Sequence, residues 1–156
     1  MSITWLEYTV PDQYEGFMAL YYECPGGAPV ERRDGRVHIT FDNQGVACIK
    51  DRYGSVFPDL AKHVAEVRTT SGKPVRFAGG WEQVGTGYAM LDLTLRQSFG
   101  PNETKPDYMI SVMWLGDMER LAEWSETGEY AEQQARFFEQ KLGIPRDGRR
   151  PNFTRR

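Results

Sequence analysis

The chain is poor in the side chains that usually carry catalysis or bind metals. Its 156 residues include two histidines, His38 and His63, and two cysteines, Cys24 and Cys48. None of them stands at the short spacing of a structural zinc site, such as C-x-x-C or H-E-x-x-H. The sequence therefore predicts no metal site, no cofactor and no catalytic residue of a known motif, and it favours a protein that is not an enzyme.

A cysteine and a histidine can form a nucleophilic pair when their side chains meet. Arg36–Phe41 and Val46–Lys50 have the pattern of a hairpin, in which His38 and Cys48 would face opposite sides of a sheet. His63 could still approach Cys48 from a neighbouring helix. Because unpaired cysteines are often buried as small apolar residues, we interpret both cysteines as free thiols in a reducing compartment.

Asp92 is the most unusual acidic residue, because it stands between leucines in the middle of a predicted strand, where Asp is disfavoured. In a structural interpretation, which is favoured, it pairs with Arg96 on the same face of the strand or with a residue of a neighbouring strand. In the alternative, Asp92 is the carboxylate of a pocket between sheet and helices, in a small-ligand-binding protein or an enzyme. The other residues of this alternative pocket are polar or aromatic: Tyr88, Arg96, His63 and Trp81.

Negative charge is concentrated in residues 117–140, which hold seven acidic and two basic side chains, a net charge of −5. Such a segment is usually a solvated helix face, but it can also imitate nucleic acid or bind a protein with a basic surface. We predict a partner-binding surface here, with Trp124 as an aromatic anchor. The residues of this acidic helical surface are Asp117, Glu119, Glu123, Trp124, Glu126, Glu129 and Glu132.

Positive charge is concentrated at the end of the chain. Residues 146–156 carry a net charge of +4, against −7 for the residues before them. Arginines can bind the phosphates of nucleic acid, which keeps a nucleic-acid-associated protein open as an alternative. The acidic body and the single interleaved aromatic, Phe153, favour a flexible basic tail instead. The arginines that would contact nucleic acid are Arg149, Arg150, Arg155 and Arg156.

The length fits one domain, and we expect residues 1–145 to form it, with 146–156 as the tail. The first ten residues lack the basic start and the apolar stretch of a secretory leader. No run approaches the roughly 18 apolar residues that span a bilayer. We therefore expect a cytoplasmic protein that does not bind membranes.

The pattern of apolar residues predicts an α+β fold. Strands are expected over Ile3–Val10, Gly16–Cys24, Arg36–Phe41, Val46–Lys50, Lys73–Gly80, Trp81–Gln97 and Tyr108–Trp114, the last of them central and covered on both faces. Helices are expected over Ser55–Arg68, over Met118–Trp124, and along a stripe of Ala131, Ala135, Phe138 and Leu142 that stops at Gly143. The first two strands form a candidate hairpin. Together, these strands and helices predict a mostly antiparallel, twisted sheet of six or seven strands, with one helix inserted mid-chain and two C-terminal helices packed on the sheet.

Two classes of function remain. The preferred one is a protein-binding inhibitor or immunity-type protein of bacterial or phage origin, which acts by occupying a partner through the acidic helical surface. The alternative is the pocket around Asp92. A homodimer formed through a sheet face also stays open.

Overall fold

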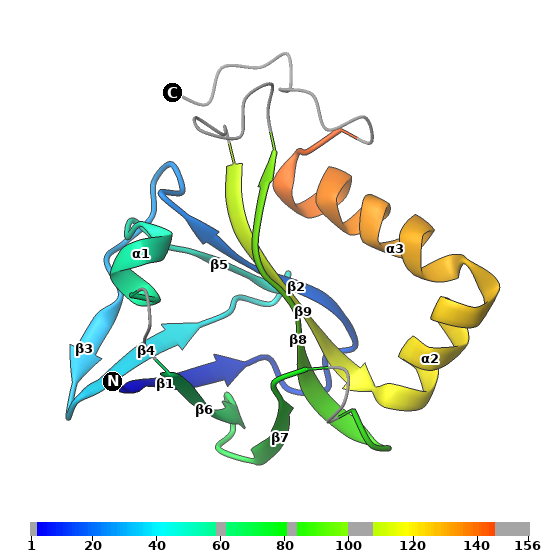
Figure 1. The fold of residues 1–156 in the computed structure, drawn as a ribbon, viewed down its shortest axis with the longest axis horizontal. Helices are drawn as coiled ribbons and strands as arrows, with labels where there is room; N and C mark the ends of the chain where they lie inside the picture. Colours follow the sequence, from blue (N-terminus) through cyan, green and yellow to red (C-terminus); the bar gives the residue numbers. More distant parts are fainter. Residues whose placement is uncertain (1–2, 59–61, 81–83, 100–107, 146–156) are drawn as a thin grey trace.

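The computed structural model describes residues 3–58, 62–80, 84–99 and 108–145; of residues 94–99 and 108 it describes the backbone. Its main feature is a strongly curled sheet, a half-barrel (Figure 1). The described residues form nine strands in the order β3-β4-β1-β6-β7-β8-β9-β2-β5. Their bounds are β1 Ile3–Val10, β2 Gly16–Tyr22, β3 Glu31–Arg33, β4 Arg36–Thr40, β5 Val46–Cys48, β6 Lys62–Thr69, β7 Pro74–Ala78, β8 Tyr88–Phe99 and β9 Tyr108–Asp117.

The sheet is mixed, with both parallel and antiparallel pairs. β1 runs parallel to both of its neighbours, β4 and β6, and the pairs β2–β5 and β7–β8 are parallel as well. The pairs β2–β9, β3–β4, β6–β7 and β8–β9 are antiparallel. The expectation of a mostly antiparallel sheet with six or seven strands is therefore wrong, although the α+β class fits.

Short connections between distant strands force the sheet to curl. β4 is second in the strand order and β5 is ninth, yet only residues 41–45 join them. In a flat sheet, seven strand spacings would separate them by about 34 Å. Five linking residues span at most about 21 Å. The two ends of the sheet must therefore approach each other.

The same topology explains why the expected hairpins do not form. Ile3–Val10 does not pair with Gly16–Cys24, and Arg36–Phe41 does not pair with Val46–Lys50. The turn signal at 42–45 is nevertheless real, because Asp42 Oδ1 accepts hydrogen bonds from the N–H groups of Gln44 at 2.8 Å and Val46 at 3.1 Å. The turn carries the chain across the open side of the half-barrel instead of between neighbouring strands.

The helix expected over Ser55–Arg68 is also wrong. Helix α1 is a single turn, Tyr53–Val56, and residues 62–69 form strand β6. Val67 and Thr69 are buried on one side of this strand, while Glu66 and Arg68 are exposed on the other. The β-branched residues at 64, 67 and 69 favour a strand. The spacing of the apolar residues in this segment fits a helix only in part, and for this reason the predicted helical stripe was wrong.

Strand β9 is buried on both faces, as the sequence predicted: every residue from Ile110 to Gly116 is buried. Its side chains enter two separate cores. Met113 and Leu115 join the inner core, which fills the half-barrel with residues of β1, β2, β4 and the α1 region. Val112 and Trp114 join the outer core, which lies between the sheet and the C-terminal helices.

The two C-terminal helices are confirmed. Helix α2, Met118–Thr127, and helix α3, Glu129–Phe137, run along the outer side of β8 and β9 and meet at Gly128 (Figure 1). The chain continues as a π-helical turn, η2, Phe138–Leu142, and stops at Gly143 as expected: its φ is 70°, and the N–H of Ile144 bonds to the carbonyl of Phe138 at 3.0 Å. Ala131 is exposed, so the apolar side of the helix is shifted from the predicted stripe.

A disulfide joins Cys24 to Cys48, so the interpretation of both residues as free thiols is wrong. β5 pairs in parallel with β2, and the N–H of Cys24 bonds to the carbonyl of Ile49 at 2.8 Å. This pairing places the two Cα atoms 5.3 Å apart, within disulfide range. The bond also removes Cys48 as a nucleophile, and with it the argument for a reducing compartment.

The disulfide is expected to stabilise the fold by about 3 kcal/mol, because it closes a loop of 24 residues in the unfolded chain. Urea unfolding with and without reductant measures this contribution. The variant with Cys24→Ser and Cys48→Ser should show the lower stability and no response to reductant. Two reactive thiols in the native, unreduced protein would contradict the bond.

Candidate functional site

The acidic helical surface lies on α2 and the start of α3, directed away from the outer core. Glu119, Glu123 and Glu126 follow one another at helical spacing on α2, and all three are exposed. Met118 and Leu121 lie on the opposite, buried side. The spacing of the acidic residues in the sequence therefore placed them together correctly.

Trp124 faces inward. Its ring packs against Trp114 at 5.2 Å and Phe17 at 6.2 Å, as part of an aromatic cluster that also holds Tyr130 and Phe137. Edge-to-face contacts of this kind add to the burial of each ring. Trp124 thus fixes α2 on the sheet, and its role as an interface anchor stays a prediction.

Several carboxylates of the surface already have partners within the molecule. Glu119 accepts the N–H of Gly87 at 2.8 and 3.2 Å, which ties the start of α2 to the start of β8. Glu129 accepts a hydrogen bond from the amide of Gln133 at 2.8 Å, and Glu132 lies 3.8 Å from the guanidinium of Arg136. These contacts hold the helices in place as well as contributing charge.

Glu123 and Glu126 differ from the others. In the described part of the chain their carboxylates make no hydrogen bond and no ion pair. Glu126 lies in the last turn of α2, which contains no basic residue, and Glu123 lies just before it. Negative charge at a helix C-terminus is unfavourable against the helix dipole by roughly 0.3–1 kcal/mol. The charge of Glu126 therefore does not stabilise the helix, and that of Glu123 has no countercharge among the described residues.

Asp92 lies on β8 beside the inner core, opposite Met113 of β9. Its Oδ1 is buried and has no hydrogen-bond partner among the described residues. Burial raises the pKa of its carboxyl from 3.8 to about 6. Burial also raises the pKa of Tyr8 and of Tyr22, and in both cases the charge of Asp92 adds to the effect.

The residues around Asp92 differ from the predicted pocket. The two tyrosines, Tyr8 and Tyr22, were missed because they belong to distant strands, and so was Ser111, whose hydroxyl lies 2.6 Å from that of Tyr22. Tyr88 begins β8, about 13 Å from Asp92 along the strand. Trp81 and the side chain of Arg96 lie outside the described residues, so the Asp92–Arg96 pair stays a prediction.

The remaining predicted pocket residues have other neighbours. His63 packs edge-on against Phe57 at 4.7 Å, and burial lowers its pKa. The hydroxyl of Tyr88 donates to the carbonyl of Tyr14 at 2.5 Å, and its ring helps to line a cavity of about 630 Å³ with Lys73 and other residues of the β6–β7 region. The described contacts do not gather these side chains around Asp92.

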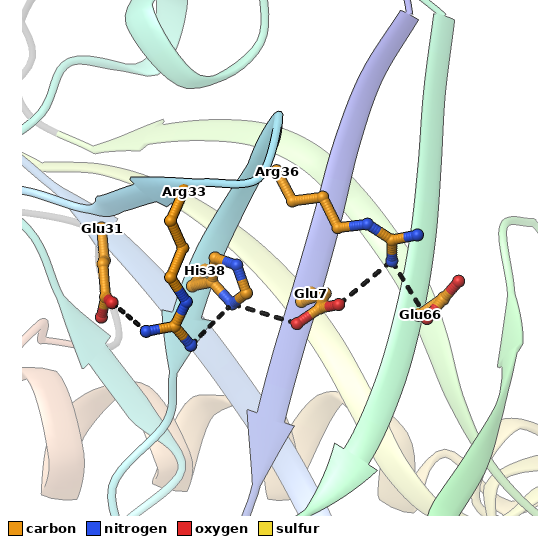
Figure 2. A network of polar contacts seen from close by, with 6 residues as sticks. All are labelled: Glu7, Glu31, Arg33, Arg36, His38 and Glu66. Atoms are coloured by element: carbon orange, nitrogen blue, oxygen red, sulfur yellow. Dashed lines mark hydrogen bonds and ion pairs between the residues drawn. The ribbon is translucent and has the colours of Figure 1, made fainter.

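A network of polar contacts that the sequence did not reveal crosses the outer face of β3, β4, β1 and β6 (Figure 2). The guanidinium of Arg36 lies 3.1 Å from both Glu7 and Glu66, and Nδ1 of His38 lies 3.0 Å from the other oxygen of Glu7. Arg33 continues the network from His38 to Glu31. The parallel pairs β4–β1 and β1–β6 and the antiparallel pair β3–β4 align these residues, and such cross-strand contacts support a sheet face.

Other kinds of site find little support in the described residues. There, no three or more His, Cys, Asp or Glu side chains are grouped as metal ligands would be. Of the helices described, none is both long and apolar enough to cross a membrane.

Comparison with known proteins gives no family. No family model matches the chain, and no curated protein matches it. One solved structure, described as "Putative Lipoprotein from Bacillus anthracis", is similar to it with a TM-score of 0.47 and 13% identity. The match covers 74% of this chain and 71% of that chain. A similarity at this level assigns neither a family nor a function.

The environment of Asp92 predicts how stability depends on pH. Because its pKa is about 6 in the folded protein and 3.8 without burial, the folded state binds the proton more tightly. At low pH the carboxyl is protonated and neutral, so its burial costs little. As pH rises from about 4 to about 6, the unfolded state loses this proton more readily than the folded state, and the free energy of unfolding falls by up to roughly 3 kcal/mol. Asp92→Asn should remove this loss and raise the unfolding free energy at pH 7.5 by about 1–3 kcal/mol.

Urea unfolding at pH 4.5 and pH 7.5 checks this prediction. Asp34→Asn, at an exposed turn carboxylate, is the matched control and should leave the pH dependence unchanged. If Asp92→Asn and the unaltered protein show parallel pH profiles, the carboxylate is not in the environment described.

Proposed function

We propose that the protein is a binding protein that acts by occupying a basic partner through its acidic helical surface. The observation that carries the proposal is the pair Glu123 and Glu126, two exposed carboxylates without an ion pair in the described residues, of which Glu126 lies in the last turn of α2, at the unfavourable end of the helix dipole. A basic partner would supply the missing countercharge. This mode of action is that of an inhibitor or an immunity-type protein, of bacterial or phage origin.

The way in which the surface is held supports a binding role. The aromatic cluster around Trp114 fixes α2 and α3 against the sheet, and the contact of Glu119 with Gly87 fixes the start of α2. A surface that is rigid before binding loses less conformational entropy when the partner arrives. Clustered charge also accelerates encounter with a partner of opposite charge.

Charge reversal separates binding from folding. With Glu123→Lys and Glu126→Lys, the unfolding free energy should rise by about 0.5–1 kcal/mol, because the C-terminal part of α2 exchanges negative for positive charge. The same variant should no longer capture the partner that the unaltered protein retains. Chemical denaturation measures the first effect, and affinity capture followed by mass spectrometry measures the second.

Glu23→Lys is the matched control, since Glu23 is an exposed carboxylate just beyond the end of β2 and not on α2 or α3. It should leave capture unchanged. A partner held equally well by the double reversal variant would remove this surface from consideration. A loss of capture that Glu23→Lys shares would show that net charge matters and not this site.

A second candidate is a small-ligand-binding protein, which the buried and unpartnered Oδ1 of Asp92 favours. A hydrogen-bond donor or a cation from a ligand would satisfy this oxygen, and the neighbouring rings of Tyr8 and Tyr22 suit an organic cation. Thermal unfolding at pH 8 with a panel of small amines and amidines tests it. Stabilisation of the unaltered protein that disappears in Asp92→Asn supports this candidate, and equal responses of the two proteins exclude it.

A further inference from the structure

Strands β6 and β7 separate soon after the turn that joins them. They pair at Val67 with Val75 and at Arg68 with Pro74. The rest of β6, as far as Lys62, pairs with β1 only, and the rest of β7 pairs with β8. A cavity of about 530 Å³ opens between the two strands. The sheet therefore has an internal split, with a strand edge on each side.

The direction of the backbone groups follows from two hydrogen bonds. The N–H of Thr69 bonds toward β7, to Lys73 at 2.8 Å, and the N–H of Thr70 bonds toward β1, to Val10 at 2.9 Å. Successive residues of a strand direct their backbone groups to opposite sides. His63 and Ala65 therefore direct theirs toward β7, where the described pairing ends at Val67. Their N–H and C=O groups form an unpaired edge in the described part of the sheet.

The walls of the split match an extended chain with alternating side chains. Ala65, Val75 and Phe77 line the cavity, are partly buried and pack against the inner core. Glu66 and Arg68 line the same cavity and are exposed, on the opposite face of β6. One face of the split is thus apolar, and the other carries both signs of charge.

We propose that this split binds an extended strand of a partner protein, added beside β6. The backbone groups of His63 and Ala65 are two residues apart, about 6.8 Å, which is the repeat of an extended chain. Such a chain would bond to both residues, place alternate apolar side chains against Ala65 and Phe77, and direct the side chains between them toward Glu66 and Arg68. A helix has no free backbone groups to offer, so a strand is the occupant that the edge selects.

A peptide-display library of random eight-residue peptides tests the proposal. Selected peptides should carry apolar residues at every second position. Ala65→Lys places a charge on the apolar wall and should weaken binding by at least about tenfold. Val64→Lys makes the same change one residue away, on the other face of β6, and should change affinity by less than about twofold.

Ala65→Pro is the second variant. It removes the N–H that points into the split, and the ladder to β1 remains because even-numbered residues of β6 form it. Circular dichroism establishes that each variant is folded. No selected peptide, or equal losses in Ala65→Lys and Val64→Lys, would overturn the proposal. The variant with Glu123→Lys and Glu126→Lys should still bind the selected peptides, which separates this site from the acidic helical surface.

Discussion

The ladder that holds β9 between β2 and β8 is the interaction on which the rest of the structure depends. Seven consecutive residue pairs join β9 to β2, and β9 contributes buried side chains to both cores. Trp114 is fully buried, with Phe17 at 5.4 Å and Trp124 at 5.2 Å. A strand buried on both faces can have little polar surface, and the buried residues of β9 from Ile110 to Gly116 include no charged side chain.

Gly116 shows how closely the elements meet at the end of this strand. Its φ is 155°, and a Cβ there would lie 2.6 Å from the side chain of Glu15 and 3.0 Å from that of Trp114. The next residues begin α2, so the direction of the helix arm is set where β9 ends. The acidic surface of α2 is thus carried by the best-packed part of the molecule. The split between β6 and β7, in contrast, lies where the strands are incompletely paired.

The sequence pattern predicted those elements that are determined by their own segment of the chain. β9 was recognisable because both of its faces are apolar, and the end of the last helix because Gly143, Ile144 and Pro145 form a stop signal. In each case the side-chain period or a turn residue sufficed.

Pairing partners could not be predicted in the same way. Alternation along Ile3–Val10 shows which side chains are buried, but it is the same for a parallel and an antiparallel neighbour. The disulfide, the charge network of Glu7 and Arg36, and the neighbours of Asp92 all depend on strands that are distant in sequence. For the acidic helical surface, helical spacing predicted the placement of the carboxylates, while the contact of Glu119 with Gly87 needed the fold.

The proposed function is the binding of other proteins at the molecular surface. The most direct measurement is hydrogen–deuterium exchange of the protein alone and with its captured partner. Slower exchange is expected in α2 around Glu123 and Glu126 on binding, with β9 protected in both states. Protection that appears only around Asp92, Tyr8 and Tyr22, with α2 unchanged, would contradict it and would place the function inside the half-barrel.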